Sequence, residues 1–79
     1  MKILKIDRGS VHIEIDGDIL RISGEAMLPK QAPGISEYIL YQNTLHWQDP
    51  AIRSKINEQA LFAFLETEFA KRNLLLLIQ

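Results

Sequence analysis

Residues 1–28, MKILKIDRGSVHIEIDGDILRISGEAML, decide the fold. Apolar and polar side chains alternate along three short segments of this stretch, as they do in strands that bury one face. Gly9-Ser10 and Asp16-Gly17 separate the segments. Each dipeptide suits a two-residue hairpin turn, because each places a glycine where such turns need positive φ. The stretch therefore predicts three antiparallel strands, at residues 2–7, 11–15 and 18–28.

The two turns also predict a register. The pairs expected on the core-facing side are Ile6–Ile13, Leu4–Ile15, Ile13–Leu20 and Val11–Ile22. The pairs expected on the other side are Lys5–Glu14, Asp7–His12 and His12–Arg21, with Ile3, Ile19 and Met27 among them. A slip of one residue would turn every side chain to the wrong face, so agreement across two hairpins favours this pairing. One sheet face is expected to be core and the other a surface of mixed charge.

Beyond the third strand, prolines and glycines predict a loop at Pro29 to Gly34. Residues Glu37 to Gln42 are expected to form a fourth strand, with Tyr38 and Leu40 on one face. Residues 43–53 are expected to be irregular.

A helix is predicted from about Asn57 to Asn73. Asn57 suits the N-cap, since Ile56 and Leu61 then take the two positions of a hydrophobic staple; Ser54 is the other candidate cap. The apolar arc of this helix consists of Leu61, Phe62, Leu65 and Phe69, with Phe64 at its margin. Lys71, Arg72 and Asn73 are suited to a helix C-terminus.

Residues Leu74 to Ile78 read either as a final strand or as a continuation of the helix, because Leu is a good helix former. The strand is favoured because the capping signals end at Asn73 and a continuous apolar run fits a strand covered on both sides. The sequence thus predicts one α+β domain over residues 1–79. Its expected order is β-β-β-β-α-β: a four-stranded antiparallel meander, one helix packed on one sheet face, and a C-terminal strand.

Composition limits the class of protein. The 79 residues include 9 basic and 10 acidic side chains and no cysteine, which excludes disulfides and thiolate chemistry. A net charge of −1 argues against direct nucleic-acid binding, which needs a basic footprint. Charges interrupt the N-terminal segment, so no signal peptide is expected, and the longest apolar run is too short to span a membrane. We expect a cytoplasmic protein.

Three sets of residues could carry chemistry, and each has a structural alternative. Asp7 and His12 could form a general-base pair, or a cross-strand charge pair on a solvated sheet. Glu14, Asp16 and Asp18 could hold a hard cation, or serve turn formation and solubility. Trp47 could anchor a partner, or fill one end of a small core. The structural alternative is favoured in all three cases, so no catalytic residue, metal or cofactor is expected.

A family resemblance goes further than these patterns. It rests on Val11–Ile15, Leu20–Ser23 followed by Gly24-Glu25, Tyr38–Tyr41, Trp47-Gln48-Asp49-Pro50, and the segment from Ile56 into an amphipathic helix. With these segments the chain resembles immunity protein family seventy-four of bacterial polymorphic toxin systems. The resemblance implies a small α+β protein that neutralises a cognate toxin, often a nuclease, by binding it in the producing cell. It implies neither catalysis nor a cofactor.

The resemblance assigns no contact residues, so candidates are chosen by expected exposure and charge. They are His12, Glu14, Asp16, Asp18, Arg21, Glu25 and Trp47. Carboxylates on an inhibitor can complement the basic cleft of a nuclease and speed association. Two other hypotheses are a non-inhibitory interaction module or small subunit that uses the same face, and a small enzyme that uses Asp7 and His12.

Overall fold

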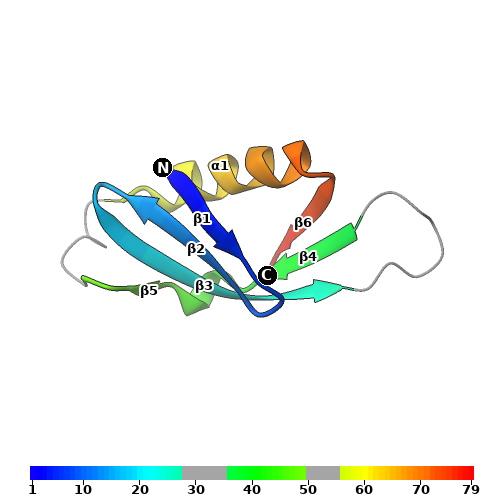
Figure 1. The fold of residues 1–79 in the computed structure, drawn as a ribbon, viewed down its shortest axis with the longest axis horizontal. Coiled ribbons are helices and arrows are strands. Elements are labelled where there is room, and N and C mark those ends of the chain that lie inside the picture. Colours follow the sequence, from blue (N-terminus) through cyan, green and yellow to red (C-terminus); the bar gives the residue numbers. More distant parts are fainter. Residues whose placement is uncertain (28–35, 50–55) are drawn as a thin grey trace.

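Residues 1–27, 36–49 and 56–79 are described by a computed structural model of the chain, and they form an α+β fold (Figure 1). The elements are β1 (Lys2–Ile6), β2 (Ser10–Ile15), β3 (Asp18–Met27), β4 (Ser36–Leu40), the 3-10 helix η1 (Gln42–Thr44), β5 (His46–Trp47), α1 (Glu58–Lys71) and β6 (Leu74–Ile78). The predicted fold class and order of the main elements are confirmed, with the short β5 as an addition.

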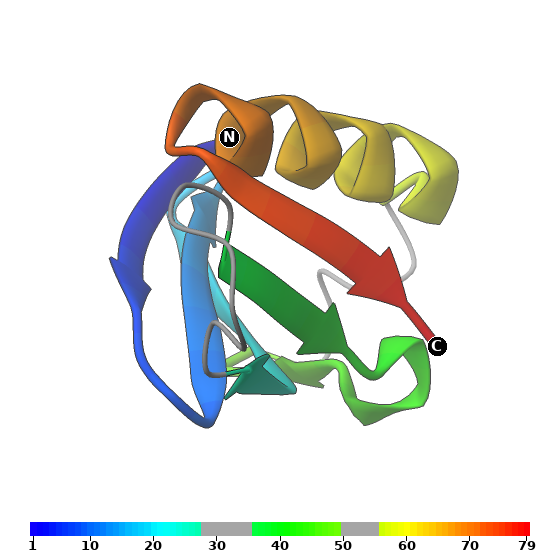
Figure 2. The same ribbon diagram turned by 90° about the vertical axis from the view of Figure 1, so that its right-hand side faces the viewer.

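The strands form one curled sheet in the order β1-β2-β3-β4-β6, and β5 pairs with β3. Pairing is antiparallel from β1 to β4, as a meander requires, and β6 then lies parallel to β4. Figure 2 shows β4 and β6 side by side, with α1 running close to β6. The helix packs against one face of the sheet and leaves the opposite face uncovered by any described element (Figure 1). We call this second face the outer face.

The second hairpin forms as predicted. Asp16 and Gly17 both have positive φ, at 50° and 85°, which is the backbone of a two-residue hairpin turn. Ile13 pairs with Leu20 and Val11 with Ile22, and all four side chains are buried. The turn therefore sets the register that places the apolar side of β2 and β3 in the core.

The predicted register of the first hairpin is wrong. The amide N–H of Asp7 donates to the carbonyl of Ser10 (2.8 Å), so Arg8 and Gly9 form the turn, one residue earlier than expected. Ile6 then pairs with Val11, and Lys5 rather than Asp7 lies opposite His12.

The register of β1 also shifts between Ile3 and Lys5, an irregularity typical of a β-bulge at Leu4. Because of this bulge, Ile3 and Ile6 both pack against the core while Leu4 is exposed. The expectation that Leu4 faces the core and Ile3 the charged side is therefore wrong.

The core lies between α1 and the inner side of the sheet. Its helix residues are Leu61, Leu65 and Phe69, all with no exposed surface, and Phe62 is partly buried beside them. Tyr38 of β4 meets Phe69 edge-on, with ring centroids 5.5 Å apart, and its hydroxyl donates to the carbonyl of Asp7 (2.7 Å). Burial raises the pKa of Tyr38, and the Asp7 carboxylate raises it further. The phenol is therefore neutral and ties β4 to the end of β1.

Both ends of α1 follow their sequence signals. The side-chain oxygen of Asn57 accepts from the amides of Gln59 (2.9 Å) and Ala60 (3.3 Å), so Asn57 is the N-cap. Asn73 has φ of 57°, the left-handed conformation that ends a helix. Ile56 packs against the core cluster that contains Leu61, in keeping with the predicted staple.

The N-cap gives a first testable prediction. Asn57→Ala should lower the free energy of unfolding by about 1 kcal/mol, because two amides at the start of α1 lose their acceptor. Chemical denaturation measures this loss. Asn57→Ser is the matched control and should be close to wild type, since its hydroxyl can still cap; an equal loss in both variants would contradict the role of the cap.

Several boundaries differ from expectation. The fourth strand spans Ser36–Leu40, and the segment expected to be irregular, residues 43–53, contains β5 and the last two residues of η1. Residues Leu74–Ile78 do form a strand, but β6 is at the end of the sheet and is not covered on both sides. The expected loop at 29–34 and the alternative cap Ser54 lie outside the described residues.

Candidate partner-binding surface

The outer face combines charges with apolar side chains. Its members follow from strand alternation and cross-strand pairing, and they include Lys5, His12, Glu14, Ile19, Arg21, Glu25, Ile39, Leu75 and Leu77. Arg21 lies opposite His12 and Ile19 opposite Glu14, at the β2–β3 end of this face. Glu25 and Ile39 pair farther along, at the β3–β4 end. The predicted mixed-charge surface is present, although the first hairpin contributes different residues from those expected.

Glu14, Arg21 and Glu25 are exposed on this face, as their candidacy required. Glu25 accepts a hydrogen bond from the Tyr41 hydroxyl (3.2 Å), and this bond raises the pKa of Tyr41. His12 is half-buried, and its Nδ1 forms no hydrogen bond within the described part of the chain. The sheet therefore brings four of the seven candidates to one side.

Asp16 and Asp18 are not exposed members of the outer face. Asp16 is exposed but belongs to the hairpin turn. Asp18 is only 7% exposed, and its carboxylate accepts the amide N–H of Asp49 (2.7 Å). The expected exposure of Asp18 is therefore wrong, and its carboxylate ties the chain after β5 to the start of β3.

Trp47 is 6% exposed and belongs to the core cluster. It pairs with Leu20 through β5, and its Nε1 has no hydrogen-bond partner among the described residues. The structure thus matches the alternative in which Trp47 fills one end of the core.

The geometry suggested for an enzyme is not formed by this register. Asp7 makes an ion pair with Lys5 (3.5 Å), and His12 lies between Lys5 and Arg21 in the ladder. The expected opposition of Asp7 and His12 is wrong. Within residues 1–27, 36–49 and 56–79, no three acidic or histidine side chains gather as a metal site would require.

Sequence reasoning missed the apolar end of the outer face. Leu75 is 49% exposed and Leu77 is 38% exposed, and they lie beside Glu37 and Ile39 in the ladder. The run Leu74–Ile78 is apolar at every position, so no alternation marked which residues would face outward. The pairing of β6 with β4 shows which of these residues face outward.

A groove of about 540 Å³ adjoins β6. Its lining consists of Gln42, Glu58, Gln59, Phe62, Ala63, Glu66 and Ile78. The α1 residues in this list recur at intervals of three and four positions, as 58/62/66 and 59/63 do, so they form one stripe along the helix. Phe62, Ala63 and Ile78 provide apolar surface, and Glu58 and Glu66 provide negative charge.

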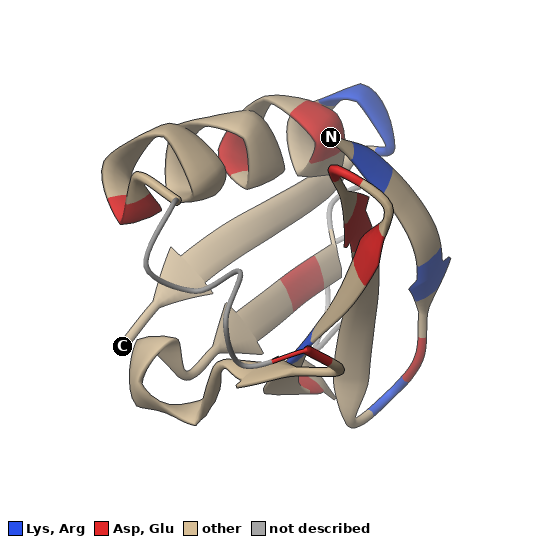
Figure 3. Ribbon diagram, turned by 90° about the vertical axis from the view of Figure 1, so that its left-hand side faces the viewer, with Lys and Arg blue, Asp and Glu red and all other residues tan. Residues whose placement is uncertain are grey.

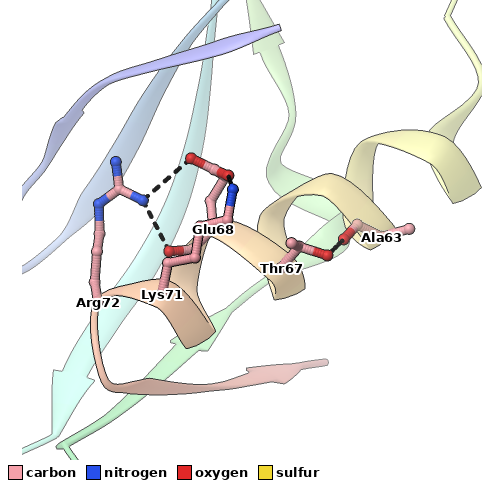
Figure 4. A network of polar contacts seen from close by, with 5 residues as sticks. All are labelled: Ala63, Thr67, Glu68, Lys71 and Arg72. Carbon is pink, nitrogen blue, oxygen red and sulfur yellow. Dashed lines mark hydrogen bonds and ion pairs between the residues drawn. The ribbon is translucent and has the colours of Figure 1, made fainter.

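The third glutamate of α1, Glu68, already forms ion pairs within the helix. Glu68 accepts hydrogen bonds from Lys71 (2.9 Å) and Arg72 (3.3 Å), and Arg72 also bonds the Glu68 carbonyl (Figure 4). The bond from Lys71 is the main reason that the pKa of Glu68 is lowered. Figure 3 shows acidic positions along α1 and basic ones at its C-terminal end. Glu58 and Glu66 form no ion pair within the described residues and remain available to a partner.

No helix in the described part of the chain is long and apolar enough to cross a bilayer. Residues 3–78 match the model of a protein family described as immunity protein 74. No curated protein and no solved structure gives a match. The family match includes the helix and, apart from Lys2 at the start of β1, every described strand, so it concerns the whole fold.

Proposed function

We propose, from the premise that the chain belongs to the immunity protein 74 family, that it binds a cognate bacterial toxin and neutralises it by occlusion. The family match over residues 3–78 is the observation that carries this proposal. The protein would act in the cytoplasm of the producing cell, by binding and without catalysis or a cofactor. An inhibitor of this kind needs an exposed, rigid surface that the fold does not use for its own core.

The outer face meets that requirement. Its side chains alternate with the buried ones on the same strands, so the core fixes their positions. Exposed charges at Glu14 and Arg21 lie next to the apolar Ile19, and Glu25 lies beside Ile39 farther along the face. Apolar side chains among charges are common at protein interfaces. We propose that this face contacts the toxin.

A nuclease is the toxin class that the charges favour. Nucleases bind phosphate and therefore carry basic clefts, which exposed carboxylates complement. Glu14 and Glu25 supply such carboxylates on the outer face, and Asp16 supplies another at the adjoining turn. The buried Asp18 would act on binding only by holding the hairpin in place.

Co-expression tests the function. A candidate toxin domain from a neighbouring reading frame should stop growth of a host when expressed alone, and co-expression of the protein should restore growth. The purified pair should also form a stoichiometric complex that lacks toxin activity. A complex with full toxin activity would favour the interaction module over the inhibitor, and an unrelieved growth arrest with folded protein present would overturn the proposal.

Charge reversal tests the surface. Glu14→Lys combined with Glu25→Lys should slow association with the toxin by about tenfold at low salt, because both changes remove steering charge. The loss should shrink at high salt, where screening weakens the same interaction. Stopped-flow or surface-binding kinetics at two ionic strengths measure both effects.

The matched control replaces both residues by Gln, which keeps hydrogen-bond acceptors for partners such as Tyr41. It should show a smaller loss in the same direction. Thermal unfolding should hardly change in either variant, since exposed charge pairs contribute only about 0–1 kcal/mol. Unchanged association and dissociation rates in the reversal variant would remove the outer face from the proposal.

A further inference from the structure

Strand β6 has one edge that no described strand pairs with. It is the last strand of the sheet, and β4 is the only described strand with which it pairs. At its end, the Gln79 amide donates to the Leu40 carbonyl and the Gln79 carbonyl accepts from Gln42, both at 2.8 Å. Main-chain groups of successive residues point to opposite sides of a strand. Leu77 and Leu75 therefore also bond toward β4, while the amides and carbonyls of Leu74, Leu76 and Ile78 point to the open edge.

The sequence of this edge strand lacks the residues that usually protect an edge against pairing. Natural edge strands are commonly short, bulged, or marked by Lys or Pro, because an open apolar edge recruits other strands. The residues of β6 are LLLLI, with no charge, no Pro and no bulge in its five pairs with β4. An unprotected edge of this kind points to a strand that is added when the protein binds its partner.

The groove adjoins the C-terminal end of this edge. Its lining joins Ile78 of β6 to the stripe of α1 that contains Phe62 and Ala63, and Figure 2 shows the helix beside β6. Inner side chains of an added strand that lie level with Ile78 would enter this groove. Side chains on its outer side would lie next to Leu75 and Leu77.

Glu58 and Glu66 determine which side chains suit the inner side of an added strand. Long basic side chains fit there, because their stems can cover Phe62 while their charged ends reach the carboxylates. A second copy of this chain is a poor occupant. Its own β6 would place Leu and Ile in the groove, and its nearby Lys71 and Arg72 are already bound to Glu68. Its other edge strand, β1, contains two lysines, but a register shift between Ile3 and Lys5 interrupts it, and such irregularities disfavour the addition of a strand.

We infer that the open edge of β6 accepts an extended segment of the toxin as an additional strand, with alternating basic and apolar residues. The basic side chains face Glu58 and Glu66, and the apolar ones extend the outer face beside Leu75 and Leu77. This inference rests on the proposed function and adds to it the segment chemistry and the main-chain mode of recognition.

Residue-resolved hydrogen exchange by NMR tests the added strand, with the toxin domain identified by the co-expression experiment as the probe. In the free protein, the amides of Leu76 and Ile78 should exchange fast, while those of Leu75 and Leu77 are protected by β4. In the complex, Leu76 and Ile78 should lose their fast exchange. Docking on the outer face alone would leave this alternation unchanged.

The outcomes separate the two proposals. An inhibited complex in which Leu76 and Ile78 still exchange fast would overturn the added strand and leave the proposed function standing. Absence of any complex would overturn both. Protection of these amides in the free protein, together with a dimer in sedimentation equilibrium, would show that a second copy occupies the edge and would overturn the inference.

A matched pair of variants tests the groove. Glu58→Gln combined with Glu66→Gln should raise the dissociation rate of the complex roughly tenfold or more, as expected when charge-assisted hydrogen bonds are lost. Glu68→Gln, on the same helix but paired internally, should leave the rate unchanged. Equal rates for all three proteins would show that basic side chains do not occupy the groove.

Discussion

Leu65→Ala is expected to lower the free energy of unfolding by about 2–5 kcal/mol. Leu65 has no exposed surface and lies between Leu61 and Phe69 on the buried side of α1. Truncation removes apolar contacts and leaves a cavity that close-packed neighbours fill only in part. A domain of this length has a total stability of roughly 4–12 kcal/mol, so the variant should melt far below wild type. Urea denaturation followed by circular dichroism measures the loss.

Leu75→Ala is the matched control, because it makes the same chemical change on the outer face. Leu75 is 49% exposed, and its truncation should cost less than about 1 kcal/mol. Equal losses at the two positions would mean that the face of α1 that contains Leu65 does not pack into the core.

The second hairpin could be predicted from sequence because its turn leaves little choice. Asp16-Gly17 adopts positive φ at both residues, a conformation that few other dipeptides tolerate. Once that turn is fixed, strand alternation sets the pairs of β2 and β3. Local chemistry was sufficient here, and the same holds for the cap at Asn57 and the stop at Asn73.

The first hairpin could not be predicted in this way because its glycine is ambiguous. Gly9 serves a turn either with Ser10 or with Arg8, and the structure uses Arg8. Ile3, Leu4 and Ile6 are all apolar, so the sequence offers no sign of the bulge that turns Leu4 outward. The packing of Ile3 and Ile6 against the core, a tertiary effect, decides the register.

The site residues could be predicted only in part, because contacts between residues distant in sequence decide which of them are exposed. Asp18 is buried by a bond to Asp49, 31 positions away, and no local pattern signals it. The exposed leucines of β6 could not be predicted for a related reason. In a run that is apolar at every position, the sequence does not indicate which side chains face the core. The charges of β2 and β3 were found because their strands alternate, whereas the edge and the groove exist only in the folded sheet.

Gly24 supports a second stability prediction. A glycine is needed here because there is no room for a side chain, and not because the backbone adopts an unusual conformation. It lies where β3 begins to pair with β4, opposite Leu40. A Cβ placed on Gly24 would lie 2.5 Å from the Ile39 carbonyl oxygen and 2.5 Å from Cε1 of Tyr38. The carbonyl belongs to the β4 backbone, and the Tyr38 ring is held against Phe69 and the Asp7 carbonyl. Neither neighbour can give way alone.

Gly24→Ala should therefore lower the free energy of unfolding by about 1–3 kcal/mol, as overpacking does, even though Ala suits a strand better than Gly. Gly9→Ala is the matched control: a Cβ there meets nothing within 4 Å, and the φ of Gly9 is not in the positive range. That change should be neutral or stabilise the protein by up to about 1 kcal/mol, by restricting the unfolded chain. Thermal and urea unfolding of the two variants measure the difference in stability.

If Gly24→Ala were as stable as Gly9→Ala, β4 would approach β3 less closely than this sheet requires. Since β4 carries β6, a displaced β4 would also shift the edge at which we place the toxin segment, so Gly24→Ala should weaken toxin binding as well as stability.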